Sequence, residues 1–85
     1  MGIDQLELGK ANAAVALGGA ELARRTGYPE NRWSEVLSGK RWPLESSLEK
    51  AAKSLGVDTD YLAIAIRIKR ISNKLLDTQG KDKLY

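Results

Sequence analysis

The stretch of sequence that decides the fold is LARRTGYPENRWSEVLSGKRWP, residues 22–43. Gly27 can adopt the positive φ of a left-handed cap, so it is typical of the residue just after a helix. Shortly after it, Pro29 suits the first position of a new helix, because the N–H that proline lacks would have no partner there. The stretch therefore predicts two short helices, at about 20–26 and 29–38, joined by a tight turn.

The second predicted helix has one apolar and one polar side. Trp33, Val36 and Leu37 recur at the spacing i, i+3, i+4 and are expected to face the core. The polar residues that then face solvent are Asn31, Arg32, Ser34, Glu35 and Ser38. Two short helices with a glycine-containing turn between them are the outline of a helix-turn-helix motif.

The segments on both sides of this stretch also predict helices. Upstream, the apolar residues that keep helical spacing are Ile3, Leu6, Ala13, Ala14 and Leu17. They predict a first helix that ends near Gly18. Downstream, the apolar residues on one face of a helix at about 45–55 are Leu48, Ala51, Ala52 and Leu55. Gly56 is a natural end for that helix, and Asp58 is a good N-cap for a last helix that starts at Thr59.

The last segment carries a regular apolar stripe. Its members are spaced 3-4-3-4, as in the seam of a coiled coil: Tyr61, Ile64, Ile68, Ile71 and Leu75. Residues 62–70 also alternate in a way that suits a strand. A helix to about Asp77 is favoured, because Asp58 would cap it and the seam continues beyond the alternation. The stripe exceeds what a five-helix core needs, so it indicates a self-association surface. The cations of this segment are expected on a solvated face, and the alternative is that they add flanking phosphate contacts: Arg67, Lys69, Arg70 and Lys74.

The composition excludes several classes of protein. The 85-residue chain has no Cys and no His, which rules out a disulfide framework, a Cys/His zinc site and Cys–His or Ser–His catalysis. We therefore expect no enzyme and no cofactor. Fourteen Lys and Arg residues against 11 Asp and Glu give a net charge of +3, which permits a polyanionic partner. The longest mainly apolar run, Tyr61–Ile66, is too short to span a membrane, and no secretory signal is visible, so a cytoplasmic location is expected.

Three pieces of the sequence together resemble the Xre/Cro/phage-repressor (lambda repressor-like) helix-turn-helix family. They are Leu22–Gly27, Trp33–Pro43 and Leu55–Leu62, and the resemblance covers roughly residues 10–62. It implies an all-α fold of about five helices, of which the last is extended. In this family the third helix enters the major groove of double-stranded DNA.

The resemblance also divides the chain and assigns roles to positions. Residues 1–62 would form the helix-turn-helix DNA-binding domain, and residues 63–85 a helical extension that serves in dimerisation and has a frayed end. The expected base-reading residues are Glu30, Asn31, Arg32 and Glu35. The expected phosphate contacts are Ser34, Ser38, Lys40 and Arg41, with free N–H groups at the start of the second helix. With the apolar stripe included, the expected dimerisation residues are Trp42, Leu44, Tyr61, Ile64, Ile68, Ile71 and Leu75.

Two functions follow as hypotheses. The first is a sequence-specific DNA-binding transcriptional regulator, like the repressors and Cro proteins of phages and mobile elements, that binds a two-fold operator as a homodimer. The alternative is a protein-interaction module of the anti-activator or antitoxin-like type, which keeps the fold but binds a partner protein. Gly19 stands where many relatives carry a phosphate-contacting Gln, and Glu30 and Glu35 put negative charge on the face that would meet DNA. Both features favour the alternative.

Overall fold

The computed structural model of the chain describes residues 2–82, with side chains described through Leu75. The helices in that range are α1 (Gln5–Val15), α2 (Gly19–Thr26), α3 (Glu30–Ser38), α4 (Glu45–Leu55) and α5 (Thr59–Asp82). Residues 2–82 contain no strand, which confirms an all-α fold and decides between helix and strand for residues 62–70. The backbone remains helical to Asp82, past the expected end at Asp77. The expected frayed end falls partly on residues 83–85, which lie outside the described range.

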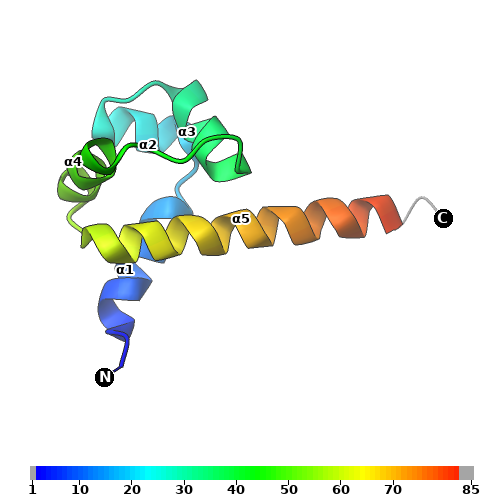
Figure 1. Cartoon of the computed structure of the whole chain (residues 1–85), viewed down its shortest axis with the longest axis horizontal. Coiled ribbons are helices and arrows are strands. Elements are labelled where there is room, and N and C mark those ends of the chain that lie inside the picture. The colour runs from blue at the N-terminus through cyan, green and yellow to red at the C-terminus, as the bar shows by residue number, and fades with distance from the viewer. Residues whose placement is uncertain (1, 83–85) are drawn as a thin grey trace.

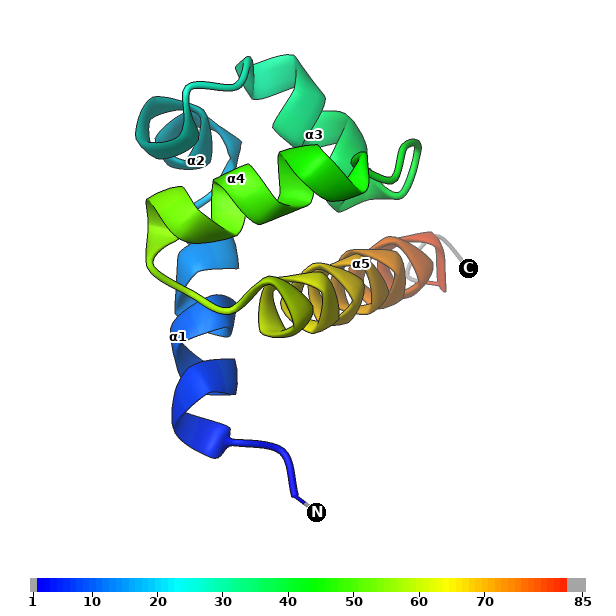
Figure 2. The same ribbon diagram turned by 60° about the vertical axis from the view of Figure 1, so that its left-hand side comes forward.

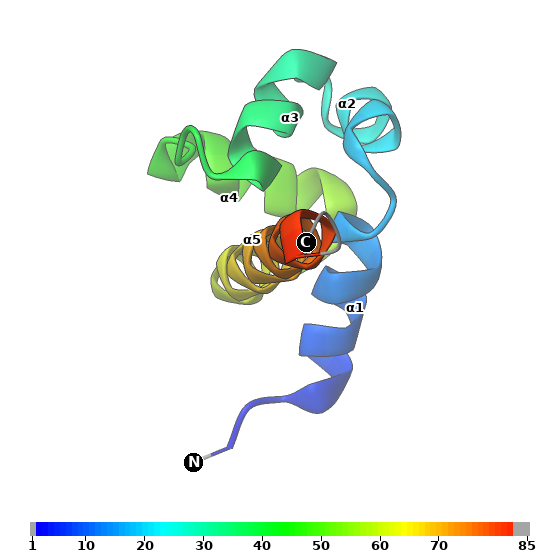
Figure 3. The same ribbon diagram turned by 90° about the vertical axis from the view of Figure 1, so that its right-hand side faces the viewer.

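The helices are arranged in two groups. Helices α2, α3 and α4 lie above α5, and α1 packs beside the start of α5 and extends below it (Figure 2). Helix α5 is a long rod whose second half extends beyond the other helices (Figure 1). With the C-terminal end of α5 toward the viewer, α2, α3 and α4 lie above the rod and α1 lies at its right-hand side (Figure 3).

The core receives residues from every helix. The largest fully buried side chains are Val15, Leu22, Leu62 and Ile66. Each stabilises the fold by about 1.5–3 kcal/mol relative to an exposed side chain. Since Leu62 and Ile66 both belong to the first half of α5, that half is part of the domain. The part of α5 beyond the core is a continuation of the same helix.

The helix ends follow from the sequence with small shifts. Gly27, Gly39 and Gly56 have φ values of 82°, 93° and 71° and end α2, α3 and α4. Helix α3 begins one residue later than expected, because Pro29 lies at the N-cap in an extended conformation. The carboxylate of Asp58 accepts a hydrogen bond from the N–H of Asp60 at 2.9 Å, as expected of an N-cap for α5.

The buried face of α1 differs from the expected one. Helix α1 buries Ala11, Ala14 and Val15, whereas Leu6 is 70% exposed and Leu17 is 42% exposed. Small side chains on this face let α1 approach α5 closely, so the buried face is not marked by large apolar residues. Asp4 caps α1 by accepting hydrogen bonds from the N–H groups of Leu6 and Glu7 at 3.0 and 3.3 Å.

None of the helices in the described part of the chain has the length and apolar character needed to cross a lipid bilayer.

Candidate nucleic-acid interface

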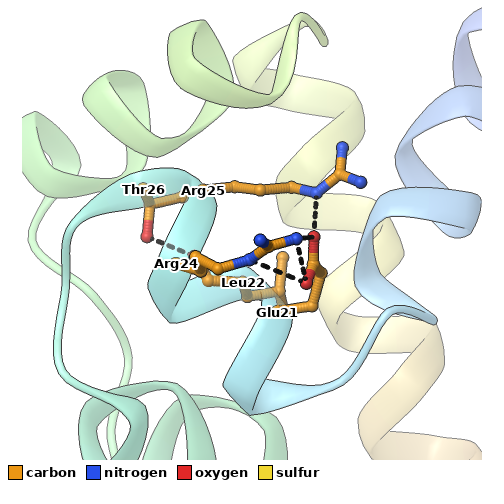
Figure 4. Close-up of polar contacts among 5 residues, drawn as sticks. All are labelled: Glu21, Leu22, Arg24, Arg25 and Thr26. Atoms are coloured by element: carbon orange, nitrogen blue, oxygen red, sulfur yellow. Dashed lines mark hydrogen bonds and ion pairs between the residues drawn. The ribbon is translucent and has the colours of Figure 1, made fainter.

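Helix α3 is fixed to α2 by its tryptophan. The Trp33 side chain is 4% exposed, and its Nε1–H donates a hydrogen bond to Oγ1 of Thr26 at 2.9 Å. The Thr26 hydroxyl in turn donates to the carbonyl of Leu22, one turn back along α2, at 2.7 Å (Figure 4). This chain of bonds holds the turn of residues 27–29 and sets the orientation of α3 relative to α2. The expectation that Trp33 is a core residue is confirmed.

The opposite side of α3 is open to solvent. A shallow hollow on this side is lined by Glu30, Asn31, Ser34, Glu35 and Lys40. Asn31, Ser34 and Lys40 are exposed, and Glu35 is half-buried. Helix α3 lies at the edge of the molecule in all three views (Figures 1–3). The structure therefore brings Glu30, Asn31 and Glu35 together with two of the expected phosphate contacts.

Arg32 lies apart from these residues. Its guanidinium stands over the Tyr28 ring, 6.0 Å from the ring centroid. It also lines a second hollow with Pro43, in the loop between α3 and α4, and Ser47, in the first turn of α4. Of the four expected base-reading residues, Arg32 is therefore the one on the flank of α3.

The start of α3 lies close to the start of α2. A Cβ atom at Gly19 would lie 3.6 Å from Cγ of Glu30 and 3.8 Å from Cβ of Trp33. The Glu30 side chain thus lies beside the N-terminus of α2, where free N–H groups were expected to meet a phosphate. A carboxylate near this N-terminus would be favoured by the helix dipole, and it would compete with a phosphate for the same position.

The remaining phosphate candidates lie at the end of α3 and in the turn that follows it. The N–H groups of Lys40 and Arg41 both donate to the carbonyl of Glu35, at 3.0 and 3.3 Å. The Arg41 guanidinium also approaches the Glu35 carboxylate, with an Nε–Oε2 distance of 3.8 Å. Ser38 is exposed, and its hydroxyl donates to the same carbonyl of Glu35 at 3.2 Å. These residues share one edge of the open face of α3.

Helix α5 contacts the end of α3 through Arg70 and Asn73, which the sequence did not assign to the candidate site. The Arg70 Nε–H donates to the carbonyl of Val36 at 2.7 Å, and its Nη2 donates to the carbonyl of Arg41 at 2.5 Å. The Asn73 amide donates to the carbonyl of Leu37 at 3.3 Å. Arg70 was expected on a solvated face, and that expectation is wrong, because its side chain caps the last turn of α3.

The loop between α3 and α4 is held by the same part of α5. The guanidinium groups of Arg67 and Arg70 lie 4.7 and 4.9 Å from the centroid of the Trp42 ring. Cation–π contacts at partly exposed sites are worth about 0.5–1 kcal/mol each. Arg67 and Arg70 therefore help to fix Trp42, which was expected to serve in dimerisation.

The two arginines of α2 are engaged with a glutamate. Arg24 and Arg25 both donate to the same oxygen of the Glu21 carboxylate, at 2.7 and 2.8 Å (Figure 4). The hydrogen bonds from Arg24, and then those from Arg25, lower the pKa of Glu21 from 4.5 to about 2. The contact with Glu21 also raises the pKa of Arg24. Arg25 lines a hollow with α1 and the α4–α5 turn, so it is directed away from the open face of α3.

The apolar stripe of α5 is largely exposed. Ile68, Ile71 and Leu75 are 43%, 61% and 58% exposed, on the side of α5 opposite the buried Leu62 and Ile66. Of the other expected dimerisation residues, Trp42 and Leu44 are exposed, and Tyr61 and Ile64 are half-buried. The Tyr61 hydroxyl accepts a hydrogen bond from the Asp4 N–H at 2.8 Å. Tyr61 is thus already engaged within the chain.

Comparison of the chain with family models, with curated proteins and with solved structures finds no match.

Proposed function

We propose that this chain is a sequence-specific DNA-binding regulator, similar in kind to the Xre, Cro and phage-repressor proteins. In this proposal α2, the turn of residues 27–29 and α3 form a lambda repressor-like helix-turn-helix unit, and α3 enters the major groove. One observation carries the proposal: α3 is anchored on its inner side by the buried Trp33 and presents an open polar face. A helix fixed in this way can insert its outer side chains into a groove without rearrangement of the core.

The chemistry of the open face suits base reading. The Asn31 amide can donate to and accept from the edge of an adenine, and the Glu30 or Glu35 carboxylate can accept from the N4 amino group of a cytosine. Ser34, Ser38 and Lys40 border these groups and would contact phosphates, which set the register of the protein on the duplex. Arg32, on the flank of α3, would reach a neighbouring phosphate or a guanine.

The exposed stripe on α5 supports a homodimer. Ile68, Ile71 and Leu75 would pack against the same residues of a second copy, and a two-fold contact of this kind uses the same patch on both chains. A dimer of helix-turn-helix units would bind a two-fold operator with half-sites about one helical turn apart.

A second function is favoured by a specific contact, the ion pair between Arg41 and Glu35. This pair engages one expected phosphate-binding cation, and Glu30 and Glu35 put two carboxylates on the face that would meet DNA. A protein-interaction module of the anti-activator or antitoxin-like type would use the same face of α3 to bind a partner protein. The two functions differ in how strongly the affinity for duplex DNA would depend on salt concentration.

The deciding experiment is a salt titration of binding to duplex DNA. We expect the affinity for random duplex to fall steeply between about 50 and 300 mM salt, because each neutralised phosphate contributes about −0.9 to the slope of log K against log salt. Lys40→Ala should make that slope shallower by about 1. Lys53→Ala removes the same charge from an exposed position on α4 and should leave the slope unchanged. A flat response in the unmodified protein would favour the interaction module.

A further inference from the structure

The end of α3 is completed by side chains of α5. The last four carbonyls of a helix have no partner within that helix. In α3 the carbonyl of Glu35 accepts from the N–H of Lys40, whereas the carbonyl of Val36 receives only a long bond, 3.4 Å, from the N–H of Gly39. Arg70 and Asn73 supply side-chain donors to the carbonyls of Val36 and Leu37. Their positive or polar groups also lie where the helix dipole favours a cation.

Arg70 differs from an ordinary helix cap because it binds two separate segments. One nitrogen of its guanidinium binds the carbonyl of Val36 inside α3, and another binds the carbonyl of Arg41 in the following loop. Its Cζ also lies 4.9 Å from the Trp42 ring centroid. A guanidinium has several N–H groups in a fixed plane, so it can make these contacts at once, whereas a lysine has a single nitrogen.

We infer that Arg70 is a positioning residue that holds the Lys40–Arg41 turn in place at the end of α3. This inference rests on the proposed function, in which Lys40 and Arg41 meet phosphates. By fixing the backbone of that turn before binding, Arg70 removes part of the entropy that ordering the turn on DNA would otherwise cost. The element that carries the association stripe would then also prepare the DNA-binding face.

The test compares Arg70→Gln with Arg67→Gln. Both changes remove one positive charge and one contact with the Trp42 ring, but only the first removes hydrogen bonds to the carbonyls of α3 and its turn. In the free protein, we expect Arg70→Gln to speed amide hydrogen exchange at Lys40 and Arg41 by about tenfold or more. Exchange at the buried Leu62 should remain slow, and Arg67→Gln should leave the turn unchanged. Equal exchange at the turn in the two variants would overturn the inference.

Arg70→Lys separates geometry from charge. It keeps the cation at the end of α3 but replaces the planar set of guanidinium donors with a single nitrogen on a flexible stem, so exchange at Lys40 and Arg41 should lie between the unmodified protein and Arg70→Gln. Full restoration by lysine would show that charge alone suffices and would overturn the two-carbonyl role. Should Arg70→Gln fail to fold, the Arg70 Nε proton of the unmodified protein is followed instead. A slowly exchanging resonance supports the inference, and a rapidly exchanging one overturns it.

DNA binding gives a separate readout. In the salt titration, Arg70→Gln should reduce the slope by about 1–2 more than Arg67→Gln does, since two phosphate contacts lose their fixed positions. An equal reduction by the two variants would contradict the positioning role. If the unmodified protein binds no DNA, the proposed function fails, whereas the exchange measurements still decide whether Arg70 fixes the turn.

Discussion

Trp33 combines two roles in a single side chain. Its ring is a buried member of the hydrophobic core, and its Nε1–H donates a hydrogen bond to the hydroxyl of Thr26. An unpaired N–H on this buried indole would reduce the free energy of unfolding by about 1–3 kcal/mol. The position of Thr26 therefore matters for stability, as does the volume of the ring. The orientation of α3 relative to α2 therefore depends on the contact between Trp33 and Thr26, which lie on either side of the turn of residues 27–29.

We expect Trp33→Phe to reduce the free energy of unfolding by about 1–3 kcal/mol, because it removes the hydrogen bond to Thr26 and part of the buried ring volume. Trp42→Phe is the matched control. That ring is 39% exposed, and the change should cost less than about 1 kcal/mol through weaker cation–π contacts. Urea denaturation followed by far-ultraviolet circular dichroism measures both. Equal reductions in the free energy of unfolding for the two variants would contradict the anchoring role of Trp33.

The Glu21 cluster predicts a specific titration. Because the pKa of Glu21 is depressed to about 2 in the folded chain, its two arginine contacts contribute to stability above pH 4.5 and are lost as the pH falls from 4.5 through about 2. NMR of the Glu21 carboxyl carbon should show a midpoint near 2. Arg24→Ala should raise that midpoint more than Arg25→Ala does, since Arg24 makes the larger contribution. A midpoint near 4.5 in the unmodified chain would contradict the cluster.

At the scale of elements, helix ends could be read from the sequence because their causes are local. A glycine with positive φ ends each of α2, α3 and α4, and Asp58 caps α5 through its own nearby backbone. The burial of α1 could not be read in this way. Its buried face consists of alanines and Val15, and only the packing of α5 distinguishes that face from the one with Leu6.

The candidate site also has features with local causes, which the sequence predicts, and features that depend on tertiary packing, which it does not. The open face of α3 follows from the 3.6-residue period and the positions of Trp33, Val36 and Leu37. The roles of Arg70 and Asn73 could not be predicted, because each side chain reaches a carbonyl more than thirty positions earlier in the chain. Charge patterning placed Arg70 among solvated cations, and only the tertiary approach of α5 to α3 gives it partners.

Substitutions on the two sides of α5 should affect different properties: those on the buried side the stability of the monomer, and those on the exposed side its self-association. Ile66→Ala should destabilise the monomer by about 2–5 kcal/mol, because Ile66 is fully buried. Ile71→Asp should change monomer stability by less than about 0.5 kcal/mol, since that side chain is 61% exposed, but it should weaken self-association at least tenfold. Sedimentation velocity at several concentrations measures association. Unchanged association in Ile71→Asp would remove α5 from the proposed dimer interface.

At the scale of the whole molecule, folding and association should be coupled. An 85-residue chain buries a thin core, and the exposed stripe on α5 supplies apolar surface that only a second copy would cover in the proposed dimer. None of the stripe residues lines the hollow on α3, so association through α5 leaves that face open. A dimer should therefore melt at a temperature that depends on its concentration, with the open face of α3 unaffected.

We expect Tm to rise by about 4 °C for each tenfold increase in concentration, because the unfolding enthalpy is about 0.7 kcal/mol per residue, or roughly 120 kcal/mol per dimer. Differential scanning calorimetry over two decades of concentration measures this slope. In Ile71→Asp, Tm should be independent of concentration and close to the value of the unmodified chain at high dilution. A constant Tm in the unmodified chain would mean that it melts as a monomer. The two-fold operator would then lose its physical basis, whereas the arguments for α3 and Arg70 would stand because they concern one chain.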